Sequence, residues 1–508
     1  MLTHTLIGFQ LNFFLLGVVR LQPRVVGGIT LVGRFWDGLM DPTVGVMTTR
    51  TRSRWGSLKP WIAGSLLPLA LSYIAIWAVP PFYPAATKAG FVTAAYLMYQ
   101  LCISMYHVPY TSLTVHLSSV PSELDSATLY RMVAETLAVL VATVLTKVIE
   151  PIADHFATEC EGGGHMAACT YTPTQLGYMG QSIIISALCV LSGAMVLHAI
   201  SEEKAGAGAL ARGPPPSIAS GFMTVLQTPS FRYLTAMFVW VWMGVAIIQA
   251  NFFLFVEVVL EKPFSTASDL LLLMIGVTVL SEPVWFLLMV RIGKKRTFIV
   301  ALLCVLPVNI GAYFVDEQTP VWQLWVLCAS LGLSIGAVYL VPAAMNPDVI
   351  NQAALREGGQ RKEALFYAYS VFFQKLAGGL SVFVSNEILE SYGDYDSEAE
   401  RNDQAKPAIR LLVSAIPAAF TVLSALFAMW YPLTPQRERQ IKADLDRLRD
   451  LRLAESVRQQ IDASDTTKET RQSTQDADGP DQSWRPQSVW DGVVRTPGDL
   501  DEEDEEDA

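Results

Sequence analysis

Long apolar stretches recur along almost the whole chain, and they constrain its fold more than any other feature. About 20 apolar residues suffice for an α-helix to cross the hydrocarbon core of a membrane. Stretches of this kind lie near residues 4–20, 25–48, 60–82, 91–117, 128–150, 178–200, 231–259, 268–291, 297–315, 320–345, 364–388 and 408–431. The sequence therefore predicts an all-α membrane protein with twelve transmembrane helices, the first of them short.

The composition supports this interpretation. Of the 508 residues, 52% are hydrophobic and only 16% are charged, whereas soluble domains carry about 25% charged residues. Most of the net charge of −11 comes from the region after residue 431. The remainder is close to neutral and lacks the basic patches of nucleic-acid-binding proteins, so the composition favours the lipid bilayer as the main partner.

The predicted helices fall into two sets of six. Residues 1–200 form an N-terminal bundle and residues 231–432 a C-terminal bundle, joined by a cytoplasmic linker at 201–230 that contains three consecutive prolines. Two six-helix bundles with a site between them are a common plan of secondary transporters. Residues 433–508 are predicted to be a cytoplasmic tail, with a short helix and a disordered acidic end.

The loops indicate the orientation. Lys and Arg concentrate in the loops after the second, eighth and tenth segments, while residues 151–181 contain neither. By the positive-inside rule both termini face the cytoplasm, although Arg20 and Arg24 oppose this count. Cys160 and Cys169 then lie on the oxidising side, where they can pair as a disulfide. Two free thiols are the alternative.

Two aspartates, Asp37 and Asp41, lie four residues apart inside the second apolar stretch. Residues at this spacing share one face of a helix. Carboxylates inside a membrane are costly, and membrane proteins keep them mainly for ion or proton pathways. The pair therefore predicts a binding site for Na⁺ or H⁺. We find no nucleophile constellation, cofactor motif or transition-metal cluster, and we expect a protein that is not an enzyme and needs no cofactor beyond the coupling ion.

Lys375 is the cation that best complements this pair, because it lies in the middle of the eleventh stretch. An ammonium group at that depth requires a carboxylate partner or a water-filled cavity. Asp37 and Asp41, in the opposite half, are the candidate partners. We expect Lys375 to neutralise them until a cation replaces it. The alternative is a static buried ion pair that only fixes helix packing.

Other polar residues in the stretches have weaker signals. Arg131 and Glu135 can pair with each other or line a substrate cavity, and Arg34 can face the same cavity as Asp37 or play a structural role. His107 can form a hydrogen bond across helices or serve packing, and Gln249 is a polar point in the seventh stretch. Pro342 and Pro347 are predicted to break the tenth helix near its cytoplasmic end.

Several motifs together resemble one transporter family. They are GRFWDGLMDPTVG (33–45), TRSRWGSLKPW (51–61), YHVPYTSLT (106–114), DSATLYRM (125–132), MNPDVI (345–350) and EALFYAYSVFFQK (363–375). The combination is similar to the glycoside-pentoside-hexuronide cation symporters of the major facilitator superfamily. Within that family it resembles the MFSD2 branch, the sodium-dependent lysophosphatidylcholine symporters.

The resemblance implies roles for individual residues. Asp37 and Asp41 match the aspartates of the sodium site, Ser104 a polar residue of the same site, and Lys375 the coupled lysine. A second group matches residues of the substrate cavity: His107, Arg131, Glu135 and Gln249. At the position of Gln249 the lysolipid branch has an acid. The chain also has Gly17 where that branch has an acid.

We therefore expect a monomeric symporter that moves a cation, expected to be Na⁺, together with a lysophospholipid such as lysophosphatidylcholine across the plasma membrane. One alternative is a sugar or glycoside symporter of the same family, because the basic loop at 50–61 is closer to the sugar branch. The other is a non-transporting membrane scaffold whose acidic tail recruits partners.

Overall fold

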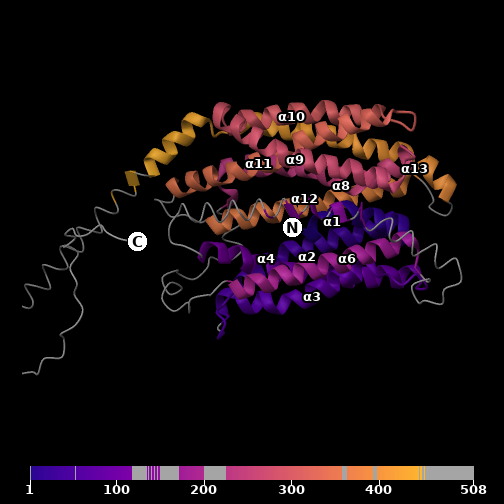
Figure 1. Cartoon of the computed structure of the whole chain (residues 1–508). Coiled ribbons are helices and arrows are strands. Elements are labelled where there is room, and N and C mark those ends of the chain that lie inside the picture. The colour runs from indigo at the N-terminus through magenta and orange to yellow at the C-terminus, as the bar shows by residue number, and fades with distance from the viewer. Residues whose placement is uncertain are drawn as a thin grey trace, which may run out of the picture. The chain divides into compact units, whose positions relative to one another are not determined.

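The computed structural model describes residues 2–51, 53–116, 171–199, 225–356, 363–392 and 398–445, with single positions between 134 and 148 and at 223, 447, 448 and 451. Every regular element in this part of the chain is a helix (Figure 1), so the all-α prediction is confirmed. The chain divides into a compact unit at residues 1–445 and a second unit at 446–508. The description below concerns the first unit.

The helices of the N-terminal half are α1 (Leu2–Phe13), the π-helical turn η1 (Phe14–Val18), α2 (Pro23–Arg50), α3 (Lys59–Trp77), α4 (Ala85–His116) and α6 (Pro173–Ala199). Those of the C-terminal half are α8 (Pro229–Leu254), η4 (Phe255–Val259), α9 (Phe264–Ile292), α10 (Lys294–Gly311), η5 (Ala312–Phe314), α11 (Val321–Arg356), α12 (Glu363–Ser391), α13 (Glu398–Val413) and α14 (Ala415–Trp430). Figure 1 shows α12 and α1 lying between the two sets.

Seven helices within the described residues are long and apolar enough to cross a membrane. Each predicted segment coincides with a helix except 128–150, which lies mostly outside the description. The prediction that prolines break the tenth segment is wrong, because α11 continues through Pro342 and Pro347 to Arg356. Membrane helices tolerate proline when neighbouring groups satisfy the freed backbone carbonyls.

Glycines explain the close packing of α2 against α12. A Cβ atom at Gly38 would lie 3.1 Å from the ring of Phe372, and one at Gly379 would lie 2.7 Å from Cβ of Arg34. Real Cβ atoms avoid the second distance, so only glycine allows the two backbones this separation. The approach brings the carboxylate-bearing helix α2 directly against α12.

An aromatic cluster joins the two halves at the ends of α1, α3 and α8. The Phe13 ring centroid lies 5.8 Å from that of Phe253 and 5.9 Å from that of Phe264, and Tyr178 lies 6.2 Å from Phe264. Trp77 stacks on Tyr178 at 5.1 Å. By the predicted orientation this is the outer end of the bundle, where these aromatic contacts join the two halves.

Polar contacts also join helices at this end. Asn386 of α12 donates to Asn12 of α1 at 2.9 Å, and Asn12 donates to the carbonyl of Ala250 at 3.1 Å. Arg24, at the start of α2, bonds to Glu387 of α12 at 3.1 Å. This ion pair gives a structural reason for one of the two arginines that oppose the positive-inside count.

A helix at residues 435–445 follows α14 and packs on the C-terminal half. Leu433 and Ile441 are buried in the core that α8, α10 and α11 share. Gly293, with a φ of 89°, leaves room for Pro435, and Lys295 donates to the carbonyl of Tyr431 at 2.8 Å. The first part of the predicted tail is therefore anchored to the membrane helices.

Candidate cation and substrate site

The ammonium group of Lys375 lies between the two aspartates. Its Nζ atom is 2.8 Å from Oδ1 of Asp37 and 2.6 Å from Oδ2 of Asp41. The lysine belongs to α12, whereas both acids belong to α2. The charges that the sequence analysis singled out in opposite halves thus meet in one ion-paired group.

The group is buried on one side and more open on the other. The Asp37 side chain is 1% exposed, whereas those of Lys375 and Asp41 are 17% and 22% exposed. Ser104 of α4 donates a hydrogen bond to Oδ1 of Asp37 at 3.2 Å. Asp41 and Lys375 are therefore the more accessible members of the group, and Asp37 is the most buried.

The oxygen atoms present fit a hard cation. Oδ2 of Asp37 is buried without a hydrogen-bond partner within the described chain, and an unsatisfied buried acceptor is costly. The two carboxylates and the Ser104 hydroxyl can serve as oxygen ligands of a cation. In the part of the chain that the structure describes, no cluster of three or more His, Cys, Asp or Glu side chains is placed to hold a metal ion. The two carboxylates and the hydroxyl of Ser104 suit a cation that prefers oxygen ligands, and not a transition metal.

A second basic group adjoins this site. Arg34 lies three residues before Asp37 on α2, and its Nη1 contacts Nε2 of His4 in α1. A guanidinium group has only donors, so Nε2 of His4 must be the acceptor and the imidazole must be neutral. Sequence reasoning missed His4; its only signal was one ionisable residue in an otherwise weakly polar first segment.

The remaining candidates occupy different positions. His107 lies half-buried on α4, one turn after Ser104, and within electrostatic range of His4. Gln249 of α8 donates to the hydroxyl of Tyr339 at 3.0 Å and faces Gly8 of α1. The candidates Arg131 and Glu135, and the cysteines Cys160 and Cys169, lie outside the described residues.

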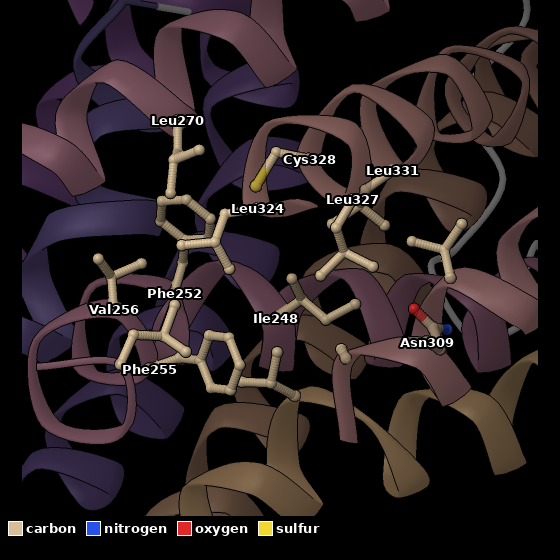
Figure 2. A pocket seen from close by; sticks show the side chains of 14 residues that line it. Ile248, Phe252, Phe255, Val256, Leu270, Asn309, Leu324, Leu327, Cys328 and Leu331 are labelled. Carbon is tan, nitrogen blue, oxygen red and sulfur yellow. The ribbon is translucent and has the colours of Figure 1, made fainter. Parts of the chain in front are cut away.

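A separate apolar cavity of about 30 Å³ lies within the C-terminal half. Figure 2 shows Phe252, Phe255 and Ile248 on one side and Leu324 and Cys328 on another, with Asn309 as its polar lining residue. The volume corresponds to about one water molecule, whereas ligand pockets usually enclose 300–1,000 Å³, to order of magnitude. The cavity is too small to be the substrate site.

Comparison with known proteins places the chain in a family. The family described as MFS/sugar transport protein matches residues 1–435. The chain belongs to this family. Its members are transporters and not enzymes, which confirms the expectation of a non-enzymatic protein, and the match together with the apolar helices makes this a multi-pass membrane protein.

Characterised relatives cover most of the chain. A sodium-dependent lysophosphatidylcholine symporter 1-A from Danio rerio is 31% identical, over 86% of this chain and 84% of its own length. The sodium-dependent lysophosphatidylcholine symporter 1 of Gallus gallus is 29% identical over 88% and 87%. A sphingosine-1-phosphate transporter, MFSD2B, from Xenopus tropicalis is 29% identical over 87% of each chain. The resemblance to the MFSD2 branch is thereby confirmed.

Solved structures agree on the fold. A bacterial homologue of the human lysosomal transporter Spinster, in an inward-facing and unoccupied conformation, matches with a TM-score of 0.58 at 14% identity, covering 87% of this chain and 95% of its own. The nucleoside transporter NupG matches with a TM-score of 0.55 at 14% identity, covering 85% and 96%. These matches establish the major facilitator fold alone.

Proposed function

We propose that this protein is a twelve-helix symporter that carries a lysophospholipid across the membrane together with Na⁺ by alternating access. The observation that carries the proposal is the ion-paired group of Lys375, Asp37 and Asp41, which joins α12 to α2. The names of the relatives at about 30% identity support the lysolipid and the sodium ion.

The ion-paired group suggests how the two cargoes are coupled. Without Na⁺, Lys375 neutralises both carboxylates and holds α12 to α2. A sodium ion that binds the carboxylate oxygens and the Ser104 hydroxyl displaces the ammonium group, because both cations compete for the same oxygens. The contact between the two halves then changes with ion occupancy, and a ligand that favours one arrangement shifts the equilibrium between conformations.

The closed aromatic end supplies the barrier that alternating access requires. In the proposed cycle the cluster around Phe13, Phe253 and Phe264 separates when the protein opens outward, and the substrate enters from that side. Each net charge that crosses is subject to the membrane potential, which contributes about 2.3 kcal/mol per 100 mV. We place the monomeric protein in the plasma membrane with both termini in the cytoplasm, as the loop charges predict.

Uptake into proteoliposomes that contain the purified protein tests the proposal. Labelled lysophosphatidylcholine and a labelled glycoside are each offered with Na⁺ and with K⁺ in its place. We expect Na⁺-dependent uptake of the lysolipid, its loss in Asp37→Asn, and normal uptake in the control Asp444→Asn, an exposed acid on the helix after α14. Na⁺-dependent uptake of the glycoside alone would establish the sugar symporter.

Two further results would contradict the proposal. Lysolipid movement that is equal in Na⁺ and K⁺ would indicate an uncoupled leak. An activity that survives Asp37→Asn and Lys375→Ala but is lost when residues 446–508 are removed would indicate the scaffold. The same four protein variants therefore separate all of the candidate functions.

A further inference from the structure

Two ion pairs join the halves at the outer end of the bundle, and both have the same polarity. Arg24 of α2 pairs with Glu387 of α12 at 3.1 Å, and Lys147 pairs with Asp269 of α9. In each pair the cation belongs to the N-terminal half and the acid to the C-terminal half. When these pairs separate, one half therefore presents cations at this end and the other presents carboxylates.

Arg24 and the start of α2 together form a set of donors for an anion. The Nε and Nη2 atoms of Arg24 lie 3.1 and 3.3 Å from the two carboxylate oxygens of Glu387. The backbone N–H of Arg24 donates to Oε2 of Glu390 at 3.3 Å. The planar fork of a guanidinium group and the free N–H groups at a helix start both bind phosphate. Glu387 and Glu390 therefore occupy donors that also suit a phosphate group.

The exposure of this ion pair argues against a purely structural role. The side chains of Arg24 and Glu387 are 67% and 32% exposed, and exposed ion pairs contribute little to stability. The buried contact between Asn386 and Asn12 joins the same end of the bundle without them. An arginine on the outer side also opposes the positive-inside rule. The pair is therefore better suited to exchange partners with a ligand than to lock the helices together.

We infer that Arg24 and Glu387 form an entry site, between α2 and α12, for the zwitterionic headgroup of the lysophospholipid. When the outer end opens, Arg24 binds the phosphate, and Glu387 together with Glu390 attracts the quaternary ammonium group of choline. That group has no N–H, so a carboxylate attracts it by charge alone. The inference rests on the proposed function and adds to it a first binding position for the substrate.

The helices that carry the entry site also carry the sodium site. Glu387 follows Lys375 by about three turns of α12, and Asp37 follows Arg24 by a similar length of α2. At the rise of an α-helix each separation is roughly 18–20 Å. Half the thickness of a bilayer, headgroups included, is about 20 Å. With the sodium site near the midplane, a headgroup at Arg24 therefore lies level with the lipid headgroups of the outer leaflet.

Two lysolipids that differ only in choline test the role of Glu387. Lysophosphatidylcholine and lysophosphatidic acid with the same acyl chain both carry a phosphate, but only the first carries a cation. In proteoliposomes with Na⁺ the wild-type protein should take up lysophosphatidylcholine several-fold faster, and Glu387→Gln should reduce this ratio of rates. Glu261→Gln is the matched control, because this exposed acid at the same end pairs with Lys406 within the C-terminal half; it should keep the wild-type ratio. An unchanged ratio in Glu387→Gln would overturn the inference, since a structural pair affects both lipids equally.

The sign of the change in KM tests Arg24. Arg24→Gln should raise KM for both lipids by roughly tenfold, the effect of losing a charge-assisted hydrogen bond. Arg24→Lys should raise it less, because an ammonium group keeps the charge but lacks the planar fork. A pair that only kept the outer end closed predicts the opposite sign, because its loss would increase the outward-facing population and lower KM.

An unchanged or lowered KM in Arg24→Gln would therefore overturn the inference, while Na⁺-dependent uptake of lysophosphatidylcholine would still support the proposed function. Absence of that uptake in the wild-type protein would overturn both.

Discussion

The ammonium group of Lys375 lies 2.6 Å from a carboxylate oxygen of Asp41, although 334 residues separate the two in the chain. The contact connects α12 with α2, and a second contact of 2.8 Å connects the same nitrogen with Asp37. One lysine therefore competes with any cation for two carboxylates at once. The affinity of the site for Na⁺ therefore depends on how strongly the carboxylates hold Lys375, and this affinity can be measured.

Replacing Lys375 with alanine should increase the affinity for Na⁺ by roughly tenfold or more, because the competing ammonium group is removed from two buried carboxylates. Transport should fall, since nothing neutralises the acids in the ion-free state. The Na⁺ concentration that half-maximally raises Tm measures the affinity. Lys406→Ala, which removes a lysine paired with the exposed Glu261, is the control; equal affinities in the two variants would contradict competition.

Ser104→Ala should weaken Na⁺ binding several-fold. The substitution removes an oxygen ligand and the hydrogen bond to Asp37, an interaction that contributes about 1 kcal/mol. Isothermal titration with Na⁺ gives the Kd directly. Ser112→Ala removes a hydroxyl on the same helix that donates to the backbone carbonyl of Val108 at 2.9 Å, and it should bind Na⁺ like the wild type. A Kd that shifts equally in both variants would argue against Ser104 as a ligand.

Gly379→Ala should destabilise the protein by about 1–3 kcal/mol, the usual cost of overpacking, because the new methyl group would meet Arg34 at 2.7 Å. Thermal unfolding in detergent measures the loss. Gly28→Ala on α2 is the matched control, since among the described residues nothing beyond its chain neighbours and the nearby backbone of its own helix lies within 4 Å of the added Cβ. That change should be neutral or stabilise the helix by roughly 0.5–1 kcal/mol. Similar Tm values would show that α2 and α12 can separate freely.

Cysteines at positions 12 and 386 should report on the outer closure, because Asn12 and Asn386 are in direct contact at 2.9 Å. The double variant Asn12→Cys with Asn386→Cys, treated with a short membrane-permeant bis-thiol reagent, should lose transport as the outer end can no longer open. Reduction of the cross-link should restore it. Each single cysteine variant controls for simple modification, and full activity after verified cross-linking would exclude this end as a moving barrier.

The helix at residues 435–445 should dock more weakly as pH rises. Burial, and next the neighbouring Asp348, raise the pKa of Glu438, while Lys294 lowers it in part. A carboxyl whose pKa is raised by docking favours the docked state when protonated, and this contribution is lost as pH rises through the raised pKa. Hydrogen-exchange protection of residues 435–445, corrected for intrinsic rates, should fall from mildly acidic to neutral pH.

Glu438→Gln should remove this pH dependence and keep the helix protected at neutral pH, because the amide cannot ionise. Asp444→Asn, an acid on the exposed face of the same helix, should retain the wild-type profile. A profile that is unchanged in Glu438→Gln would mean that another group governs docking.

The sequence by itself determined the class of fold and the candidate ions. Long apolar stretches allow only helices in a bilayer, since each backbone group must be satisfied within its own segment. Charged residues stand out there because their cost is high, which is why Asp37, Asp41 and Lys375 were recognisable without a structure. The family motifs added Ser104, whose hydroxyl resembles many others in apolar helices.

Only the tertiary structure decided which groups meet. The role of Gly379 depends on the distance between α2 and α12, and the neutral state of His4 depends on the direction of the Arg34 guanidinium. The continuous α11 shows the same limit, because proline breaks an isolated helix but not one whose neighbours accept the bend. Local sequence determines which charges are too costly to leave unpaired, whereas the choice of partner is a property of packing between helices hundreds of residues apart.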